Sequence, residues 1–179
     1  MPLDGNIEHY LQGRVIPPLA AVVGARLVRV IYWCPDQWSD EFISRPLFET
    51  TGEVELEFSN GEDVHVTWKQ NAIWFGDNAV WVYSDSRTEE RAYARCEANV
   101  VPLWQPIIGN VLRNIEVLGW GGWDAEVRAV KFCFDDTTVY IGVGLMLQSD
   151  DDVFVRSESE FFRWSRANEA KVVWSATMK

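Results

Sequence analysis

The sequence feature that most constrains the fold is a pattern that occurs twice along the 179-residue chain. The segments PLAAVVGARL and PLWQPIIGNVL align with Gly24 on Gly109, and VELEFSNG and VWVYS of the first half correspond in order to VKFCFDDT and VFVRS of the second. The first of these alignments also superposes Leu27 on Leu112, Val30 on Ile115 and Trp38 on Trp123. Since ordered self-similarity is typical of a repeated structural unit, the sequence predicts two tandem pseudo-repeats, roughly 15–87 and 100–164, with a C-terminal extension at 165–179.

Each half has the alternation of apolar and polar residues that is typical of antiparallel strands with one face in a core. Residues 54–58 alternate in this way, and the Asn-Gly pair at 60–61 predicts a hairpin turn before the next strand. In the second half residues 130–134 alternate, and Asp135 and Asp136 follow as turn residues. With further strands on both sides of these hairpins, we expect about four strands in each pseudo-repeat.

The fold class that follows is mainly β, with a minor helical part (α+β minor). Four antiparallel strands alone would leave half of an apolar face in water. The two pseudo-repeats are therefore expected to share one core, as a sandwich or a barrel-like sheet. No long linker separates them, which favours a single domain over residues 1–179.

Helices are expected to be few and short. Pro17 and Pro102 are placed to open two of them, and Gly24 and Gly109 to end them, because proline is favoured at the first helical position and glycine just beyond the last. Capping-box spacing at 86–89 and at 157–160 predicts two further short helices, over 90–95 and 161–164, and a last strand is predicted at 171–174.

The charge balance limits the partners. A formal net charge of −11 and a pI near 4.6 oppose general binding to nucleic acid and to an anionic membrane, and favour a basic partner. The apolar stretch at 15–33 is interrupted by prolines, a glycine and arginines, so no membrane span is expected. An odd number of cysteines without a CxxC spacing, and an N-terminus without the pattern of a secretion signal, favour a cytoplasmic protein.

No sequence motif indicates an enzyme, a metal site or a bound cofactor. The two histidines, His9 and His65, do not have the spacing of metal ligands, and His65 is expected on the polar face of its strand, between Val64 and Val66, as a solvent-facing or hydrogen-bonded surface residue. No serine lies in a Gly-x-Ser-x-Gly elbow. The glycines of IGVG at 141–144 lack the third glycine and the following helix of a nucleotide-binding loop.

The candidate contact residues are clustered acidic and aromatic side chains. The acidic clusters coincide with predicted turns, where the sequence is consistent both with solvated turn residues and with a negatively charged contact patch. The loop tryptophans are expected to be packing anchors or, as the alternative, contact residues. The candidates for partner binding are Asp135, Asp136, Asp150, Asp151, Asp152, Trp120, Trp123, Trp33 and Trp38.

These observations predict a non-catalytic, acidic binding protein. The expected partner is a basic polypeptide, and the expected role is that of a protein inhibitor of the immunity-protein type, in which acidic side chains meet Lys or Arg and aromatic residues form anchors. The sequence leaves two alternatives open: a small-ligand-binding protein with an aromatic-lined pocket between the pseudo-repeats, and a homo-oligomer built by pairing of sheet edges.

Overall fold

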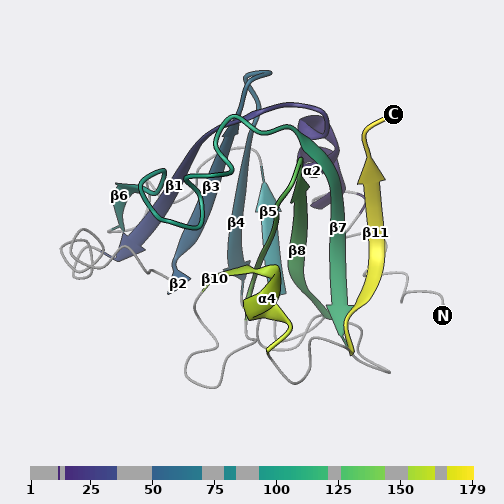
Figure 1. Cartoon of the computed structure of the whole chain (residues 1–179). Helices are drawn as coiled ribbons and strands as arrows, with labels where there is room; N and C mark the ends of the chain where they lie inside the picture. The colour runs from purple at the N-terminus through teal and green to yellow at the C-terminus, as the bar shows by residue number, and fades with distance from the viewer. Residues whose placement is uncertain are drawn as a thin grey trace.

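The computed structural model of the chain is mainly β, with two antiparallel sheets and few short helices (Figure 1). It describes residues 12, 15–35, 50–69, 79–83, 93–120, 126–143, 153–163 and 169–179. Within these ranges the sheets form no closed barrel. The mainly β class predicted from the sequence is confirmed.

The first sheet consists of five strands in the order β5-β4-β3-β1-β6. Its strands are β1 (Leu27–Pro35), β3 (Glu53–Phe58), β4 (Asp63–Lys69), β5 (Ala79–Tyr83) and β6 (Tyr93–Glu97). The hairpin between β3 and β4 turns at Asn60 and Gly61, and Gly61 has a φ of +84°. The turn predicted by the Asn-Gly pair is thus confirmed.

The second sheet consists of six strands in the order β11-β7-β8-β9-β10-β2. Its strands are β2 (Thr50–Thr51), β7 (Leu112–Trp120), β8 (Glu126–Phe134), β9 (Thr138–Val143), β10 (Val153–Ser157) and β11 (Lys171–Thr177). Although β2 directly precedes β3 in the chain, it pairs with β10 of the other sheet. Between them, the N–H of Gly52 donates to the carbonyl of Trp33 in β1 at 3.1 Å, so this short stretch of chain belongs to both sheets.

The described helices are α2 (Ile16–Val22) and α4 (Glu158–Phe161). A proline in the first turn of α2 and a capping box between Ser157 and Glu160 confirm two of the predicted helix starts. Residues 102–109 form consecutive turns instead of the predicted helix, because Pro106 has no N–H to donate and restricts the residue before it. The helix predicted over 90–95 is not observed, because residues 93–97 form the strand β6. Neither helix is long and apolar enough to cross a membrane.

Four neighbouring strands of each sheet have the same order and closely matching register, although the edge strands of the two sheets differ. The strands β1-β3-β4-β5 and β7-β8-β9-β10 are both rows of antiparallel neighbours. A register irregularity lies between Leu27 and Arg29 in β1, and another between Leu112 and Asn114 in β7. Corresponding pairs are Leu27–Phe58 with Leu112–Phe134, Tyr32–Val54 with Val117–Val130, and Val66–Val82 with Ile141–Val155.

The strands β1 and β7 meet where each begins. Arg26 and Val111 form an antiparallel bridge there. The backbone N–H···O=C bonds beside it run from Gly24 to Leu112 and from Gly109 to Leu27, each 2.8 Å long. Both glycines have a φ of +88°, in the left-handed region that glycine adopts without strain. This reciprocal junction connects the first strand of one sheet to the first strand of the other.

Buried apolar side chains from both sheets belong to one contacting cluster. The strand β4 lies against β9, β5 lies against β8, and α2 packs on β4 and β5. A buried hydrogen bond lies within this cluster, where Nε1–H of Trp104 donates to the hydroxyl of Tyr32 at 2.7 Å. The cluster includes Val30, Leu56, Val64, Val66, Leu112, Ile115, Phe132 and Ile141.

Replacing either junction glycine by alanine is expected to lower the free energy of unfolding by about 1–2 kcal/mol, the cost of a left-handed conformation in an L-residue. At Gly24 an added Cβ would meet only the Met178 side chain, at 3.5 Å, and at Gly109 it would meet nothing within 4 Å. The loss in both variants therefore comes from the backbone, and urea unfolding measures it. Val100→Ala, at a 61% exposed residue, should change stability by less than about 0.5 kcal/mol. A loss at only one glycine would show that the two ends of the junction are not equivalent.

Tyr32→Phe is expected to destabilise the fold by about 1–3 kcal/mol, because it leaves the buried N–H of Trp104 without its acceptor. Tyr140→Phe is the matched control in the second sheet, since the Tyr140 hydroxyl lies at the longer distance of 3.5 Å from a carboxylate oxygen of Glu158. Urea unfolding of both variants should give the larger loss at Tyr32. Equal losses of stability in the two variants would refute a larger contribution from the buried bond between Trp104 and Tyr32.

Candidate functional site

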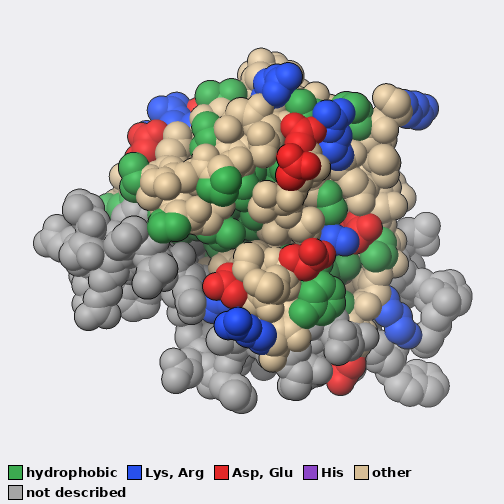
Figure 2. All heavy atoms as spheres, viewed as in Figure 1, with side chains coloured by type: hydrophobic (Ala, Val, Ile, Leu, Met, Phe, Trp, Pro, Cys, Tyr) green, Lys and Arg blue, Asp and Glu red, His purple; other side chains and the backbone are tan. Residues whose placement is uncertain are grey.

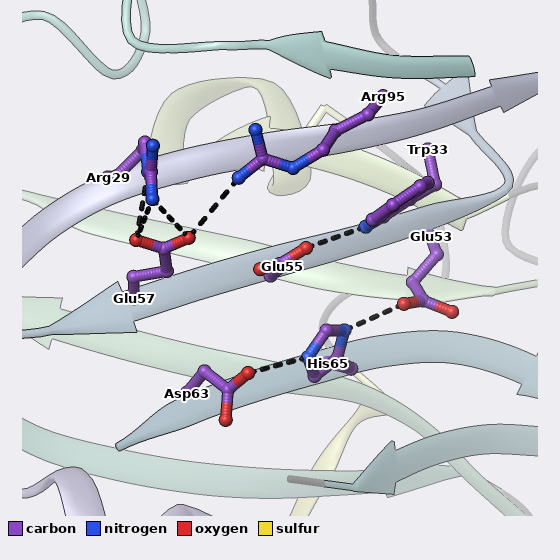
Figure 3. Close-up of polar contacts among 8 residues, drawn as sticks. All are labelled: Arg29, Trp33, Glu53, Glu55, Glu57, Asp63, His65 and Arg95. Atoms are coloured by element: carbon purple, nitrogen blue, oxygen red, sulfur yellow. Dashed lines mark hydrogen bonds and ion pairs between the residues drawn. The ribbon is translucent and has the colours of Figure 1, made fainter. Parts of the chain in front are cut away.

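A cluster of ionisable side chains lies on the outer side of β3 and β4, away from the apolar cluster between the sheets (Figure 3). Side chains alternate along a strand, so Val54 and Leu56 lie in the core while Glu53 and Glu55 face outward. The His65 cluster consists of Glu53, Glu55, Asp63 and His65. All of these except Asp63 are buried, although they point away from the core.

His65 is completely buried, and both of its ring nitrogens contact carboxylates. Nδ1 lies 2.7 Å from Oε1 of Glu53, and Nε2 lies 2.9 Å from Oδ2 of Asp63. The expectation of a solvent-facing histidine is therefore wrong. The alternation around His65 indicates which side chains share a face, but it does not indicate whether the rest of the chain covers that face.

The two carboxylates favour the protonated form of the His65 ring. Burial alone disfavours the charged imidazolium, but the hydrogen bonds to Glu53 and Asp63 outweigh it, so the pKa of His65 is raised above its ordinary value. In that form both N–H groups donate, and the ring is a cation between two anions.

Glu55 lies opposite His65 in the pairing of β3 with β4. Nε1–H of Trp33 in β1 donates to Oε2 of Glu55 at 2.7 Å. Burial raises the pKa of Glu55, and the bond from Trp33 and the charge of His65 offset only part of this rise. The sequence predicts that β3 has one face in water, and at Glu55 this prediction is wrong, since only 7% of the residue is exposed.

Glu57 ends the row of acidic residues on β3 and is neutralised by arginines. Arg29 donates to both carboxylate oxygens of Glu57, with Nη2 2.7 Å from Oε2, and Arg95 adds a longer contact of 3.4 Å. The three carboxylates of the His65 cluster, in contrast, surround one imidazole. The cluster itself therefore has an excess of negative charge when its carboxyl groups are ionised.

Two of the four positions of the His65 cluster carry apolar or aromatic side chains in the second sheet. By strand register, Glu53 corresponds to Ala129 and His65 to Tyr140, whereas Glu55 corresponds to Lys131 and Asp63 to Thr138. A second, smaller apolar cluster consists of Leu118, Ala129, Tyr140, Phe154 and Phe161. The rings of Tyr140 and Phe161 stack with centroids 3.9 Å apart, so α4 covers this outer face, as Figure 1 shows. Burying ionisable groups costs free energy that apolar packing does not, which makes the His65 cluster the candidate functional site.

The His65 cluster is suited to binding positive charge. Glu55, Asp63 and His65 each offer a ligand atom, and these atoms lie within 4.8 Å of one another, a spacing that can hold a metal ion. Protons can also neutralise the cluster, on the His65 ring and on the carboxyl group of Glu55, whose pKa is raised.

Of the residues predicted for partner binding, Asp135 and Asp136 lie in the turn between β8 and β9. The backbone N–H of Val111 donates to Oδ2 of Asp135 at 3.0 Å, and Nε of Arg113 lies 2.6 Å from Oδ1. These two contacts lower the pKa of Asp135. Asp135 thus attaches the turn to the start of β7, while Asp136 is exposed.

The predicted tryptophans are placed differently from one another. Trp33 is half-buried and belongs to the surroundings of the His65 cluster through its bond to Glu55. Trp120 is the last residue of β7, and its side chain is not described. Trp38, Trp123, Asp150, Asp151 and Asp152 lie outside the described residues.

Glu53, Glu55, Asp63 and His65 are not among the site residues predicted from the sequence. A signal for them was nevertheless present. The Asn-Gly turn fixes the register of the β3–β4 hairpin, which places Glu55 opposite His65 and Glu57 opposite Asp63. Pairing the residues of the two strands outward from the predicted turn places these acidic residues close to His65, the one histidine of the hairpin.

Comparison with known proteins does not assign the chain to a family. No family model matches the sequence, and neither a curated protein nor a solved structure is significantly similar to it.

The metal-free protein is expected to lose stability as the pH rises from about 5 to 9, because the folded state holds protons more tightly than the unfolded state. The raised pKa of His65 stabilises the fold fully below the unfolded value of about 6.5, and this contribution is lost as the pH rises through the folded pKa. The raised pKa of Glu55 acts in the same direction, starting from about 4.3. One such proton gives a slope of at most about 1.4 kcal/mol per pH unit.

Urea unfolding over this pH range in the presence of a chelator measures the effect. His65→Gln removes one titrating group and should flatten the profile above about pH 6.5. Glu55→Gln should flatten its lower part, because the amide resembles the protonated carboxyl group. A wild-type stability that rises with pH over this range would disprove the assigned direction.

Proposed function

We propose that the chain is a non-catalytic binding protein that recognises a basic polypeptide through one end of its two sheets, in the manner of an immunity protein that neutralises a toxin. The observation that carries the proposal is the distribution of charge between the strands and the segments that connect them. Four connecting segments matter most: 36–49, 70–78, 121–125 and 144–152.

These connecting segments are strongly acidic in sequence. Their acidic residues are Asp36, Asp40, Glu41, Glu49, Asp77, Asp124, Asp150, Asp151 and Asp152, and their one basic residue is Arg45. Three tryptophans, Trp38, Trp74 and Trp123, belong to the same segments. Acidic residues that steer a basic partner, combined with aromatic residues that anchor it, are typical of protein-binding surfaces.

The strand pairing supports a common location for the ends of these segments. The end of β1 lies beside the start of β3, where Trp33 pairs with Glu53, and the end of β4 lies beside the start of β5. In the second sheet the end of β7 lies beside the start of β8, and the end of β9 beside the start of β10. Each sheet therefore has two acidic segments attached to one of its ends.

The stretch formed by β2 and Gly52 brings these two ends together. Thr51 pairs with Val153 at the start of β10, while Gly52 bonds to Trp33 near the end of β1. In Figure 1 both β1 and β7 run downward from the upper part of the view, β1 toward the left and β7 toward the right. The turn with Asp135 and Asp136 lies at the opposite end of the second sheet, so the candidate residues of that turn are not part of the proposed surface.

The face that Figure 2 shows carries charges of both signs. The coloured acidic and basic side chains are interspersed over it and do not form one acidic patch. Among the described residues, Asp135 is paired with Arg113 and Glu116 with Lys131. Residues that bind a partner commonly lie on loops that a rigid scaffold positions, and the excess negative charge of this chain lies on such connecting segments.

We also infer that residues 15–87 and 100–164 are two copies of one structural unit that share a core. The matching register of the two sheets, the corresponding irregularities in β1 and β7, and the reciprocal hydrogen bonds of Gly24 and Gly109 support this inference. Duplication explains how acidic segments from both halves would come to a common end of the molecule.

The proposed surface predicts a charge-dependent interaction. Affinity capture on the immobilised chain should retain a basic polypeptide, and the purified partner should bind more weakly as the salt concentration rises. Neutralising Asp150, Asp151 and Asp152 together to asparagine should weaken binding by about tenfold or more, which calorimetry measures as a change in Kd.

The matched control removes charge from the opposite end of the sheets. The double variant Glu62→Gln and Asp136→Asn changes exposed acidic residues in the two hairpin turns and should leave the Kd within about twofold. Equal weakening by the two variants would refute the location of the surface. Capture of no basic polypeptide would refute the proposed function itself.

A further inference from the structure

We propose that the His65 cluster is a binding site for a divalent transition-metal ion, with Zn²⁺ as the best-suited ion. The ligands would be Nε2 of His65 and one carboxylate oxygen each from Glu55 and Asp63. This site is distinct from the acidic connecting segments and does not depend on the proposed binding function.

The first argument is the position of the ligand atoms. They come from two adjacent strands whose register is fixed by a tight turn, and they lie within 4.8 Å of one another. Ligand atoms around a tetrahedral zinc ion are separated by about 3.3 Å, given metal–ligand distances near 2.0–2.1 Å. Binding would require rotation of the Glu55 and Asp63 side chains to bring the atoms to that spacing, with a water molecule to complete four-coordination.

The second argument is the support around the ligands. Glu53 accepts a hydrogen bond from Nδ1–H of His65 at 2.7 Å, which leaves Nε2 as the coordinating nitrogen once its proton has left. A carboxylate behind a ligating histidine is the usual arrangement in metal proteins. Trp33 orients Glu55 in a similar way by donating to its Oε2. Two of the three ligands are thus held by a second partner.

The third argument is charge. The three carboxylates of the cluster surround one imidazole, and Glu53 and Glu55 are buried. Buried charges of one sign are costly unless they are paired or bind a metal. A divalent cation would add positive charge beside these carboxylates. In the second sheet the buried residues Ala129 and Tyr140 take the positions of Glu53 and His65, and Lys131, paired with Glu116, takes the position of Glu55.

The fourth argument selects the type of ion. An imidazole nitrogen with carboxylate oxygens suits zinc and its first-row neighbours, whereas calcium and magnesium prefer oxygen ligands alone. The described cysteines are not ligands of this site, so a mixed nitrogen–oxygen set is expected. Among the described residues this is the cluster with the chemistry of a metal site.

The experiment uses the full chain, stripped with a chelator and then titrated with zinc chloride in a calorimeter. The expected result is one ion per chain, with a visible absorption spectrum typical of four-coordination when Co²⁺ is used instead. His65→Gln should abolish this binding. Asp63→Asn, at the more exposed edge of the cluster, should weaken it by about tenfold or more and serves if His65→Gln does not fold.

Two further variants separate ligands from neighbours. Glu53→Gln removes the carboxylate behind His65 and should weaken zinc binding by about 10–100-fold without changing the stoichiometry. Glu57→Gln is the matched control on the same strand face, because its carboxylate is engaged by Arg29 and Arg95, and it should leave affinity within about threefold. Absence of stoichiometric zinc binding, unchanged binding in Asp63→Asn, or a preference for Ca²⁺ over Zn²⁺ would each overturn the proposal.

Discussion

The reciprocal hydrogen bonds that link Gly24 to Leu112 and Gly109 to Leu27 are the contacts on which the arrangement of the two sheets depends. The donor of each bond is a glycine in the left-handed conformation. Each bond holds the start of the first strand of one sheet beside the start of the first strand of the other. From this junction β1 and β7 diverge, which leaves room for the apolar side chains that pack between the sheets. The bond between Trp104 and Tyr32 satisfies the polar groups that this packing buries.

The outer faces of the two sheets use different physical means to remain buried. The second sheet combines apolar packing, in which the Tyr140 ring stacks on Phe161 of α4, with one ion pair between Lys131 and Glu116. The first sheet encloses hydrogen-bonded, charged groups around His65. Burying charged groups costs more free energy than apolar packing and requires more exact geometry, because each buried polar atom needs a hydrogen-bond partner. This cost makes the His65 cluster, rather than the apolar core, the candidate for binding an ion.

Much of the architecture could be predicted from local sequence patterns. Alternation at 54–58 and 130–134, the Asn-Gly turn and the capping box at 157–160 each depend on neighbouring residues, and each corresponds to an observed element. Burial of His65 depends on which distant parts of the chain cover its face, and a local pattern contains no such information. For the same reason, alternation alone predicts that Glu55 faces solvent, whereas Glu55 is buried. The helix expected after Pro102 fails because Pro106 lies one turn later, a conflict that was visible in the sequence.

The stacked pair of Tyr140 and Phe161 has a consequence for how such a chain can evolve. The stacking of Tyr140 on Phe161 is an apolar contact, which does not itself titrate or bind ions. Such packing would give the chain a reserve of stability if polar substitutions arose on β3 and β4. Most new polar residues in a buried position destabilise a protein, and only a protein with stability to spare tolerates them long enough for selection to act. One half of the molecule can thus remain conservative while the other acquires new chemistry.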